Sequence, residues 1–97
     1  MRYEIVIAPE AVGDLKWLKA HDRAELYDAI ERHLRHEPTR TSKSRIKRLR
    51  GISRPQFRLR VGHVRVFYDV SETTVEVLAL VPKDQADAWL REAGEQK

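Results

Sequence analysis

The chain has 97 residues, a length that supports one hydrophobic core and fits a single domain over residues 1–97. It contains 0 Cys, which excludes disulfide scaffolds, cysteine-ligated zinc and thiol nucleophiles. No apolar run approaches the roughly 20 residues of a membrane-spanning helix. The N-terminus, Met1-Arg2-Tyr3-Glu4, lacks the layout of a signal peptide. We therefore expect a cytoplasmic protein that does not associate with a membrane.

The basic residues are concentrated in one third of the chain. The whole sequence has 19 Lys and Arg against 15 Asp and Glu, a formal net charge of +4. The segment 38–68 holds 10 of the basic residues and no acidic residue, so the remainder has 9 basic and 15 acidic residues and a net charge of −6. Because the block is interleaved with apolar residues, it favours a polyanionic partner over a solvated or disordered basic arm.

The first part of the sequence predicts a strand followed by two helices. Tyr3–Ile7 is rich in β-branched and aromatic residues, which is typical of a strand. Pro9 lies in the first turn of a helix, where proline is tolerated. A second helix follows, for which we expect Asp22 to be the N-cap with Glu25 in a capping box, and it ends near Glu37, before a proline. The turn between the two helices is very short, so they form a helical hairpin.

The clearest local pattern is a β-hairpin that follows a basic loop over residues 39–55. Within the loop, residues 46–49 suggest a short strand or turn. Phe57–Val61 alternates apolar and basic residues, Gly62-His63 suits a type II′ turn, and Val64–Val70 resumes the strand. The core face then pairs Phe57 with Tyr68, Leu59 with Val66, and Val61 with Val64.

The opposite face of this hairpin carries the charge. Arg60 is placed opposite Arg65, and Arg58 opposite Phe67. Directly opposed like charges destabilise a sheet. A bound anion such as a phosphate converts that repulsion into an attraction, so this face is the candidate binding site.

The C-terminal part predicts one more strand and one more helix. Residues 74–81 are mostly apolar and indicate an interior strand, which Pro82 ends. Residues 83–93 form a helix with Trp89 and Leu90 on one side, which we expect to dock on the sheet. The element order predicts an α+β fold: an N-terminal strand and a helical hairpin, then a largely antiparallel sheet (β-α-α-β-β-β), with a C-terminal helix.

These segments together resemble the RelE/ParE superfamily of bacterial toxins over nearly the whole chain. The segments are the 3–7 strand, the helical hairpin, Lys47-Arg48-Leu49-Arg50-Gly51, the 57–68 hairpin and the 77–83 strand. The most specific is the hairpin pattern, aromatic-R-L-R-V-G-x-x-R-V-x-Y. The resemblance implies the toxin of a type II toxin–antitoxin module. RelE-like members are ribosome-dependent endoribonucleases that cut mRNA, whereas ParE-like members poison DNA gyrase.

The RelE-like branch implies catalytic roles for four basic residues, namely Arg58, Arg60, Arg65 and Lys83. The three arginines would clamp the scissile phosphate by bidentate hydrogen bonds, and Lys83 would be the general acid for the leaving 5′ oxygen. Such a reaction requires no metal and no cofactor. Trp89 falls where a RelE-type enzyme has a tyrosine, and it is a candidate for stacking on a base.

The resemblance also implies a set of partners. These are a cognate antitoxin, the ribosome with its mRNA, and operator DNA that the complex binds through the antitoxin. The remaining substrate-binding candidates are Lys43, Lys47, Arg48 and Arg50, which would contact ribosomal RNA phosphates or an acidic segment of the antitoxin.

Two other functions stay open. One is a ParE-like gyrase inhibitor without nuclease activity. The other is a catalytically weak member that only binds antitoxin or RNA, because Trp89 replaces a tyrosine and arginine is a poor general base.

Several single residues have a structural and a functional interpretation. His63 is expected to be an exposed turn residue, and Tyr68 a core residue rather than a phosphate ligand. His33 and Glu37 are four residues apart, a spacing that suits a metal, but with so few ligands and no Cys we expect a solvated helix face. Trp17 is compatible with either the core or an antitoxin contact.

Overall fold

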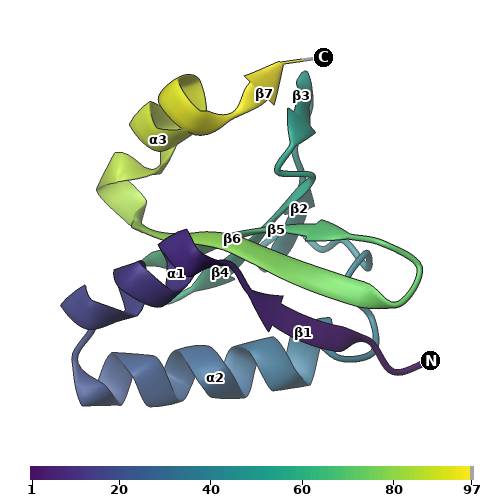
Figure 1. The fold of residues 1–97 in the computed structure, drawn as a ribbon, viewed down its shortest axis with the longest axis horizontal. Helices are drawn as coiled ribbons and strands as arrows, with labels where there is room; N and C mark the ends of the chain where they lie inside the picture. The colour runs from purple at the N-terminus through teal and green to yellow at the C-terminus, as the bar shows by residue number, and fades with distance from the viewer. Residues whose placement is uncertain (97) are drawn as a thin grey trace.

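The computed structural model describes residues 1–96, so Lys97, the last residue of the domain expected over 1–97, lies outside the described residues. The strands are β1 (Glu4–Ile7), β2 (Ile46–Arg48), β3 (Ile52–Arg54), β4 (Phe57–Val61), β5 (Val64–Val70), β6 (Thr74–Pro82) and β7 (Glu95–Gln96). The helices are α1 (Pro9–Asp14), α2 (Ala20–Leu34) and α3 (Ala86–Ala93), with 3₁₀ turns η1 (Leu15–Trp17) and η2 (Lys83–Gln85). Figure 1 shows α2 on one side of the sheet and α3 with β3 and β7 on the other.

The main sheet has five strands in the order β1-β6-β5-β4-β2. β1 is parallel to β6, and the other three pairings are antiparallel. β6 is an interior strand, as its apolar sequence predicts, with β1 on one side and β5 on the other. The α+β prediction is therefore confirmed, with β2 and β1 as the two edges.

The predicted hairpin register is confirmed pair by pair. Phe57 pairs with Tyr68, Leu59 with Val66 and Val61 with Val64, while Arg60 lies opposite Arg65 and Arg58 opposite Phe67. Gly62 has a φ of +56°, and among residues 1–96 no residue other than glycine has a positive φ. A positive φ at the first central position only is what a type II′ turn requires.

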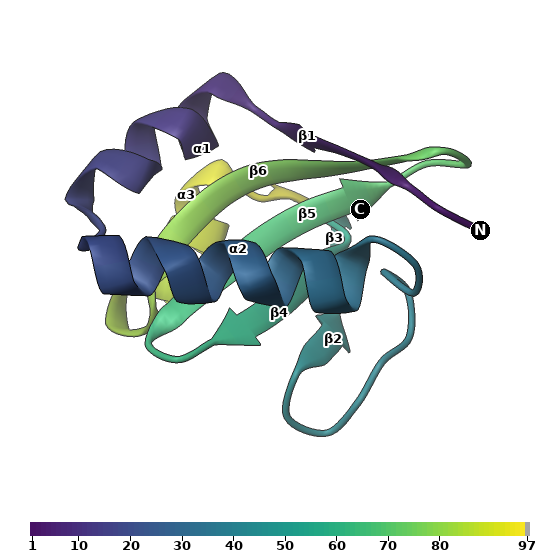
Figure 2. The same cartoon turned by 90° about the horizontal axis from the view of Figure 1, so that it is seen from below.

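The face of the sheet that packs against α2 forms the larger hydrophobic core (Figure 2). Leu26, Ile30 and Leu34 recur every four residues along α2, and all three are buried. Tyr68 is fully buried there, stacks on Phe57 with ring centroids 5.5 Å apart, and donates a hydrogen bond from its hydroxyl to Pro38 O at 2.6 Å. The interpretation of Tyr68 as a core residue is confirmed.

A smaller apolar cluster on the opposite face holds α3. Phe67, Ala79 and Val81 from the sheet are buried together with Ala86 of α3. Trp89 stacks on Phe67 with ring centroids 4.8 Å apart and an interplanar angle of 11°. The C-terminal helix is thus docked on the sheet, as its apolar side predicts.

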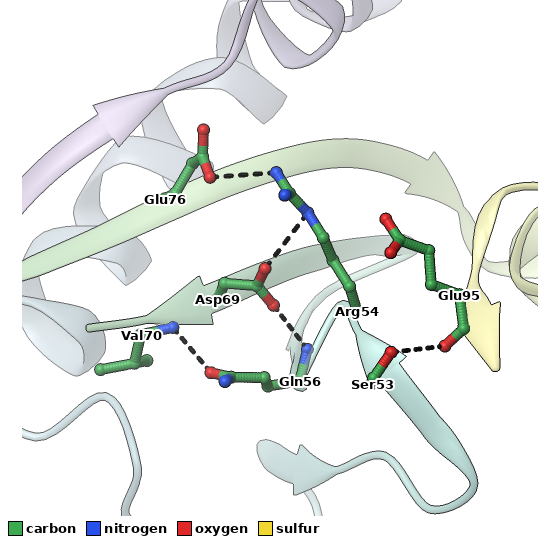
Figure 3. Close-up of polar contacts among 7 residues, drawn as sticks. All are labelled: Ser53, Arg54, Gln56, Asp69, Val70, Glu76 and Glu95. Carbon is green, nitrogen blue, oxygen red and sulfur yellow. Dashed lines mark hydrogen bonds and ion pairs between the residues drawn. The ribbon is translucent and has the colours of Figure 1, made fainter. Parts of the chain in front are cut away.

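A polar network ties the short β3–β7 pair to the main sheet (Figure 3). Arg54 of β3 forms ion pairs with Asp69 Oδ2 at 3.3 Å and with Glu76 Oε1 at 3.2 Å. Asp69 Oδ1 also accepts a hydrogen bond from Gln56 N at 2.8 Å, and Ser53 Oγ donates to Glu95 O at 3.1 Å. These contacts fix the segment before β4 and the end of the described chain above the same face that carries α3.

Three details differ from the sequence prediction. α2 begins at Ala20 with Lys19 as its N-cap, so the prediction of Asp22 as N-cap is wrong. The chain enters α2 in extended conformation at Leu18, which is buried, and the helix restarts directly after it, leaving Asp22 in the first turn. The helix ends at Leu34 rather than near Glu37, and η2 precedes α3 in the C-terminal segment.

Across residues 1–96, no helix combines the length and apolar character needed to cross a membrane.

The Tyr68 hydroxyl gives a test of the fold. Tyr68→Phe leaves the buried Pro38 carbonyl without its donor, so we expect the free energy of unfolding to fall by about 1–2 kcal/mol. Burial raises the pKa of Tyr68, so its contribution is present at neutral pH and is lost as pH rises above about 10, where the unfolded chain ionises. Urea unfolding at pH 7 and pH 10.5 measures both effects.

Tyr27→Phe is the matched control, because Tyr27 is 49% exposed. It should change the free energy of unfolding by less than about 0.5 kcal/mol. Equal effects of the two substitutions would contradict the role assigned to the Tyr68 hydroxyl.

Candidate functional site

Strand alternation gathers basic side chains on the sheet face opposite α2, at the end that holds the β4–β5 turn. Lys47 of β2 pairs with Arg58 of β4, which pairs with Phe67 of β5. In the next row towards the turn, Arg60 pairs with Arg65, and Arg60 N donates to Arg45 O at 2.9 Å. We call Arg58, Arg60 and Arg65 the arginine cluster; Lys47 flanks it on the same face.

The arginine cluster has no acidic partner in the described chain. Within residues 1–96, none of the ion pairs involves Arg58, Arg60 or Arg65. Burial lowers the pKa of Arg58, and the charge of Arg60 lowers it further. Burial likewise lowers the pKa of Arg65, with added effects from Arg58 and Arg60. The guanidinium groups of Arg58 and Arg65 still remain protonated, because arginine starts far above neutral pH.

Arg58 is the strongest candidate for a direct ligand contact. Its side chain is half-buried, and Arg58 Nε is the one buried side-chain nitrogen or oxygen among residues 1–96 that lacks a hydrogen-bond partner. An unpaired charged donor is costly in a protein interior. An anion bound to the accessible part of the Arg58 guanidinium would offset that cost and reduce the repulsion from Arg60.

Arg65 has a different environment from the other two arginines. It is only 7% exposed, and its NH1 group donates to Gly62 O at 2.9 Å and to Val64 O at 3.2 Å. The guanidinium therefore braces the β4–β5 turn from below. Arg60, by contrast, is exposed. The cluster thus combines Arg65, which is hydrogen-bonded to the turn, with the half-buried Arg58 and the exposed Arg60.

Lys83 lies at the same end of the sheet as the β4–β5 turn. Its backbone N–H donates to His63 O at 2.7 Å, immediately after Pro82 pairs with Val64. Lys83 and His63 are both exposed, and together with Pro82 and Asp84 they line a cavity of about 400 Å³. The fold thus brings the predicted general acid to the turn whose strands carry the arginine cluster.

Trp89 lies over the middle of the same face, stacked on Phe67. Because Phe67 is the cross-strand partner of Arg58, the indole sits beside the arginine cluster rather than within it. Trp89 also lines a cavity of about 310 Å³ with Leu78, Pro55 and other residues. One face of its ring is occupied by the protein's own aromatic residue.

The substrate-binding candidates of the basic loop divide between surfaces. Lys47 shares the face of the arginine cluster, whereas Arg48 turns to the α2 side and lies over the Phe57 ring, 5.2 Å from its centroid. Lys47, Arg48 and Arg50 line one cleft of about 500 Å³ along β2. Lys43 is exposed in the loop before β2 and is not among the residues that line this cleft.

Within residues 1–96, side chains that could ligate a metal lie close together at one place. His21, Asp22 and Glu25 at the start of α2 have ligand atoms within 4.8 Å of one another. His63 Nε2 lies 3.8 Å from Asp22 Oδ2. These side chains are largely exposed, and exposed groups of this kind are common without an ion, so we assign no metal to them.

Sequence reasoning missed two features of this face. It did not identify Phe67 as the platform for Trp89, although the register already placed Phe67 beside Arg58. It also did not separate Lys47 from Arg48. The sequence Ile46-Lys47-Arg48 could have separated them. Successive side chains of a strand point to opposite faces, so a buried Ile46 places Arg48 on its own face and Lys47 on the other.

Among the comparisons with known proteins, the one with solved structures identifies the fold. No family model and no curated protein sequence matches the chain. Among solved structures, the RelB–RelE antitoxin–toxin complex from Methanococcus jannaschii has a chain with a TM-score of 0.67 and 23% identity, covering 87% of this chain and 96% of that one. The archaeal RelE–RelB complex from Pyrococcus horikoshii OT3 has a chain with a TM-score of 0.69 and 26% identity, covering 86% and 97%.

Both similarities extend over most of this chain and nearly all of the matched chain. They therefore rest on the fold of most of the chain and not on one shared motif. The chain therefore has a RelE-like fold, as its resemblance to the RelE/ParE superfamily predicts.

Proposed function

We propose that this protein is the toxin of a type II toxin–antitoxin module and that it cleaves mRNA on the ribosome. The observation that carries the proposal is the arginine cluster, in which three cations share one sheet face without a carboxylate partner in the described chain. The RelE fold, seen in complexes with RelB, supports the toxin assignment and a cognate antitoxin as partner. By the same analogy, operator DNA would be bound through the antitoxin.

The proposed reaction is attack of a ribose 2′ oxygen on the adjacent phosphorus. The new P–O2′ bond closes a 2′,3′-cyclic phosphate, and the P–O5′ bond breaks. The 2′-hydroxyl proton passes to solvent water, and the 5′ oxygen takes a proton from the Lys83 ammonium group. Arg58 and Arg60 bind the non-bridging oxygens, where negative charge grows in the transition state.

The remaining residues would position this reaction. Arg65 holds the β4–β5 turn in shape and adds positive potential from beneath it. Lys47 lies beside Arg58 and contacts a neighbouring phosphate. Trp89 is half-buried and stacks on Phe67 through one ring face, so a base would stack on its other face. Lys43, Arg48 and Arg50 contribute phosphate contacts away from the reacting group.

The proposal is tested by mapping cleavage of an mRNA on programmed ribosomes. Arg60→Ala should reduce the cleavage rate by about 100-fold or more, because one charge-stabilising contact to the transition state is lost. Arg60 is exposed, so the variant should fold normally. Arg91→Ala is the control, since Arg91 is an exposed residue of α3, and it should cleave like wild type.

The outcome with wild type distinguishes the alternatives. Cuts within the A-site codon that are lost in Arg60→Ala support the ribonuclease. Arrested growth without mRNA cuts would move the assignment to gyrase inhibition or to non-catalytic binding, and gyrase-dependent DNA breaks separate those two.

Arg58 predicts a trade of stability against activity. Arg58→Met keeps an unbranched side chain out to the position of Nε but removes a buried unpaired donor and its repulsion from Arg60. We expect the free energy of unfolding to rise by about 1 kcal/mol while mRNA cleavage is lost. Thermal or urea unfolding together with the ribosome assay measures both quantities.

Arg60→Met is the comparison for stability. Its side chain is exposed, so the same substitution should raise the free energy of unfolding by less than Arg58→Met does. A destabilised Arg58→Met variant would show that Arg58 is satisfied in the free protein and would remove its assignment as a ligand group.

A further inference from the structure

A second basic cavity lies on the α2 side of the sheet, away from the arginine cluster. It has a volume of about 390 Å³ and lies between the end of α2 and the loop that leads into β2. Its lining residues are Arg32, His33, Glu37, Arg40, Thr41, Ser42, Ser44, Arg45 and Ile46. Ile46 is buried in the core shared with α2, whereas its neighbour Lys47 points to the other face. The two basic regions are thus separated by the edge strand β2.

Three arginines line this cavity, and one of them keeps its charge free of an ion pair within residues 1–96. Arg32 pairs with Asp28 at 2.9 Å, and Arg40 pairs with Glu37 at 3.0 Å. Arg45 forms no ion pair within residues 1–96; its backbone N–H donates to Ser42 Oγ at 3.0 Å, which fixes the loop. Two of the three lining guanidinium groups are thus held by carboxylates, which leaves Arg45 as the lining arginine without an ion pair in the described chain, beside hydroxyl groups that can donate hydrogen bonds.

His33 reports on the electrostatic potential of this cavity. Burial lowers the pKa of His33, and Arg45 and Arg32 lower it further, while Asp28 opposes them. The imidazole is therefore kept largely neutral at pH 7 and remains able to donate one hydrogen bond to an acceptor in the cavity.

We propose that this cavity binds a backbone phosphodiester of an RNA strand, at a site separate from the arginine cluster. Guanidinium groups match the geometry of phosphate oxygens, and serine and threonine hydroxyls complete such contacts. RNA as the source of the phosphate rests on the proposed function; the presence of an anion site does not.

The neighbouring cleft favours a polymeric anion over a free one. The cleft lined by Lys47, Arg48 and Arg50 shares Thr41, Ser42 and Ile46 with this cavity. The two hollows therefore follow each other along the open edge of β2. A strand whose phosphates recur at regular spacing can occupy both, whereas a single phosphate ion can occupy one.

The test uses a 2′-O-methyl RNA oligonucleotide, which cannot be cleaved by 2′ attack, and follows the His33 ring by NMR. Bound phosphate offsets the charges of Arg45 and Arg32, so the pKa of His33 should rise on binding. The ring signals of His36, which does not line the cavity, serve as internal reference and should not move. Arg45→Gln should weaken binding about tenfold and reduce the salt dependence by about one phosphate contact.

Arg91→Gln is the matched charge control and should bind like wild type. An unchanged His33 titration, or equal affinity of wild type and Arg45→Gln, would overturn the proposal. Inorganic phosphate that produces the same His33 response at the same concentration as the oligonucleotide would overturn the assignment to RNA. If the oligonucleotide shifts the His33 titration but the protein does not cut mRNA, the anion site is supported and the ribonuclease proposal is contradicted. If the protein cuts mRNA but the His33 titration does not change, the ribonuclease is supported and the anion site is contradicted.

Discussion

The site depends on the register of the β4–β5 hairpin. Leu59, Val66 and Tyr68 are fully buried on one face, and strict alternation then forces Arg58, Arg60 and Arg65 onto the other. A shift of one residue would bury the arginines and expose the core, so the register cannot slip. The opposed pair Arg60 and Arg65 is destabilising by itself. The hydrophobic face offsets that repulsion, and the free protein retains a concentrated positive charge.

The same face is divided by charge along the strands. Arginines lie near the β4–β5 turn, the apolar residues Phe67 and Ala79 lie in the middle under α3, and Asp69 and Glu76 lie at the far end. Arg54 pairs with both carboxylates and offsets part of the negative charge at the acidic end (Figure 3). These carboxylates are therefore occupied by a structural arginine and do not compete with an anion for the arginine cluster. Arg54 belongs to the basic block of the sequence but not to the site.

The sequence predicted the parts of the fold that depend on local pattern. Alternation in residues 57–70 gave the register, and the four-residue spacing of Leu26, Ile30 and Leu34 gave the buried face of α2. The β3–β7 pair was not predicted, because Ile52–Arg54 and Glu95–Gln96 are short and far apart in sequence, and only tertiary contacts bring them together. The prediction of Asp22 as N-cap was wrong for a related reason. The burial of Leu18 sets where α2 begins, and a capping motif contains no information on that tertiary contact.

The candidate site was predicted as a set of residues but not as an arrangement. Charge and register placed Arg58, Arg60 and Arg65 together, yet only the structure separates a braced Arg65 from an open Arg60. Nothing in the sequence indicated that Arg32, His33 and Arg45 meet in one cavity, because they belong to α2 and to a loop without periodicity. From its sequence alone, the polar face of α2 is predicted to be solvated. Only the structure shows that the loop before β2 lies beside it.

The chemistry of the arginine cluster explains why a second phosphate contact would matter. Guanidinium groups can neutralise charge but do not exchange protons near neutral pH, so Lys83 is the one proton donor among the four basic residues proposed to act. A site with so little acid–base capacity must gain much of its rate from alignment of the 2′ oxygen with the leaving group, a term that reaches roughly 7–11 kcal/mol in ideal cases. One phosphate held at Arg58 leaves the strand free to rotate about that point. In the proposed function, a second phosphate held on the far side of β2 would fix its direction, and the ribosome would supply the remaining constraint on the substrate.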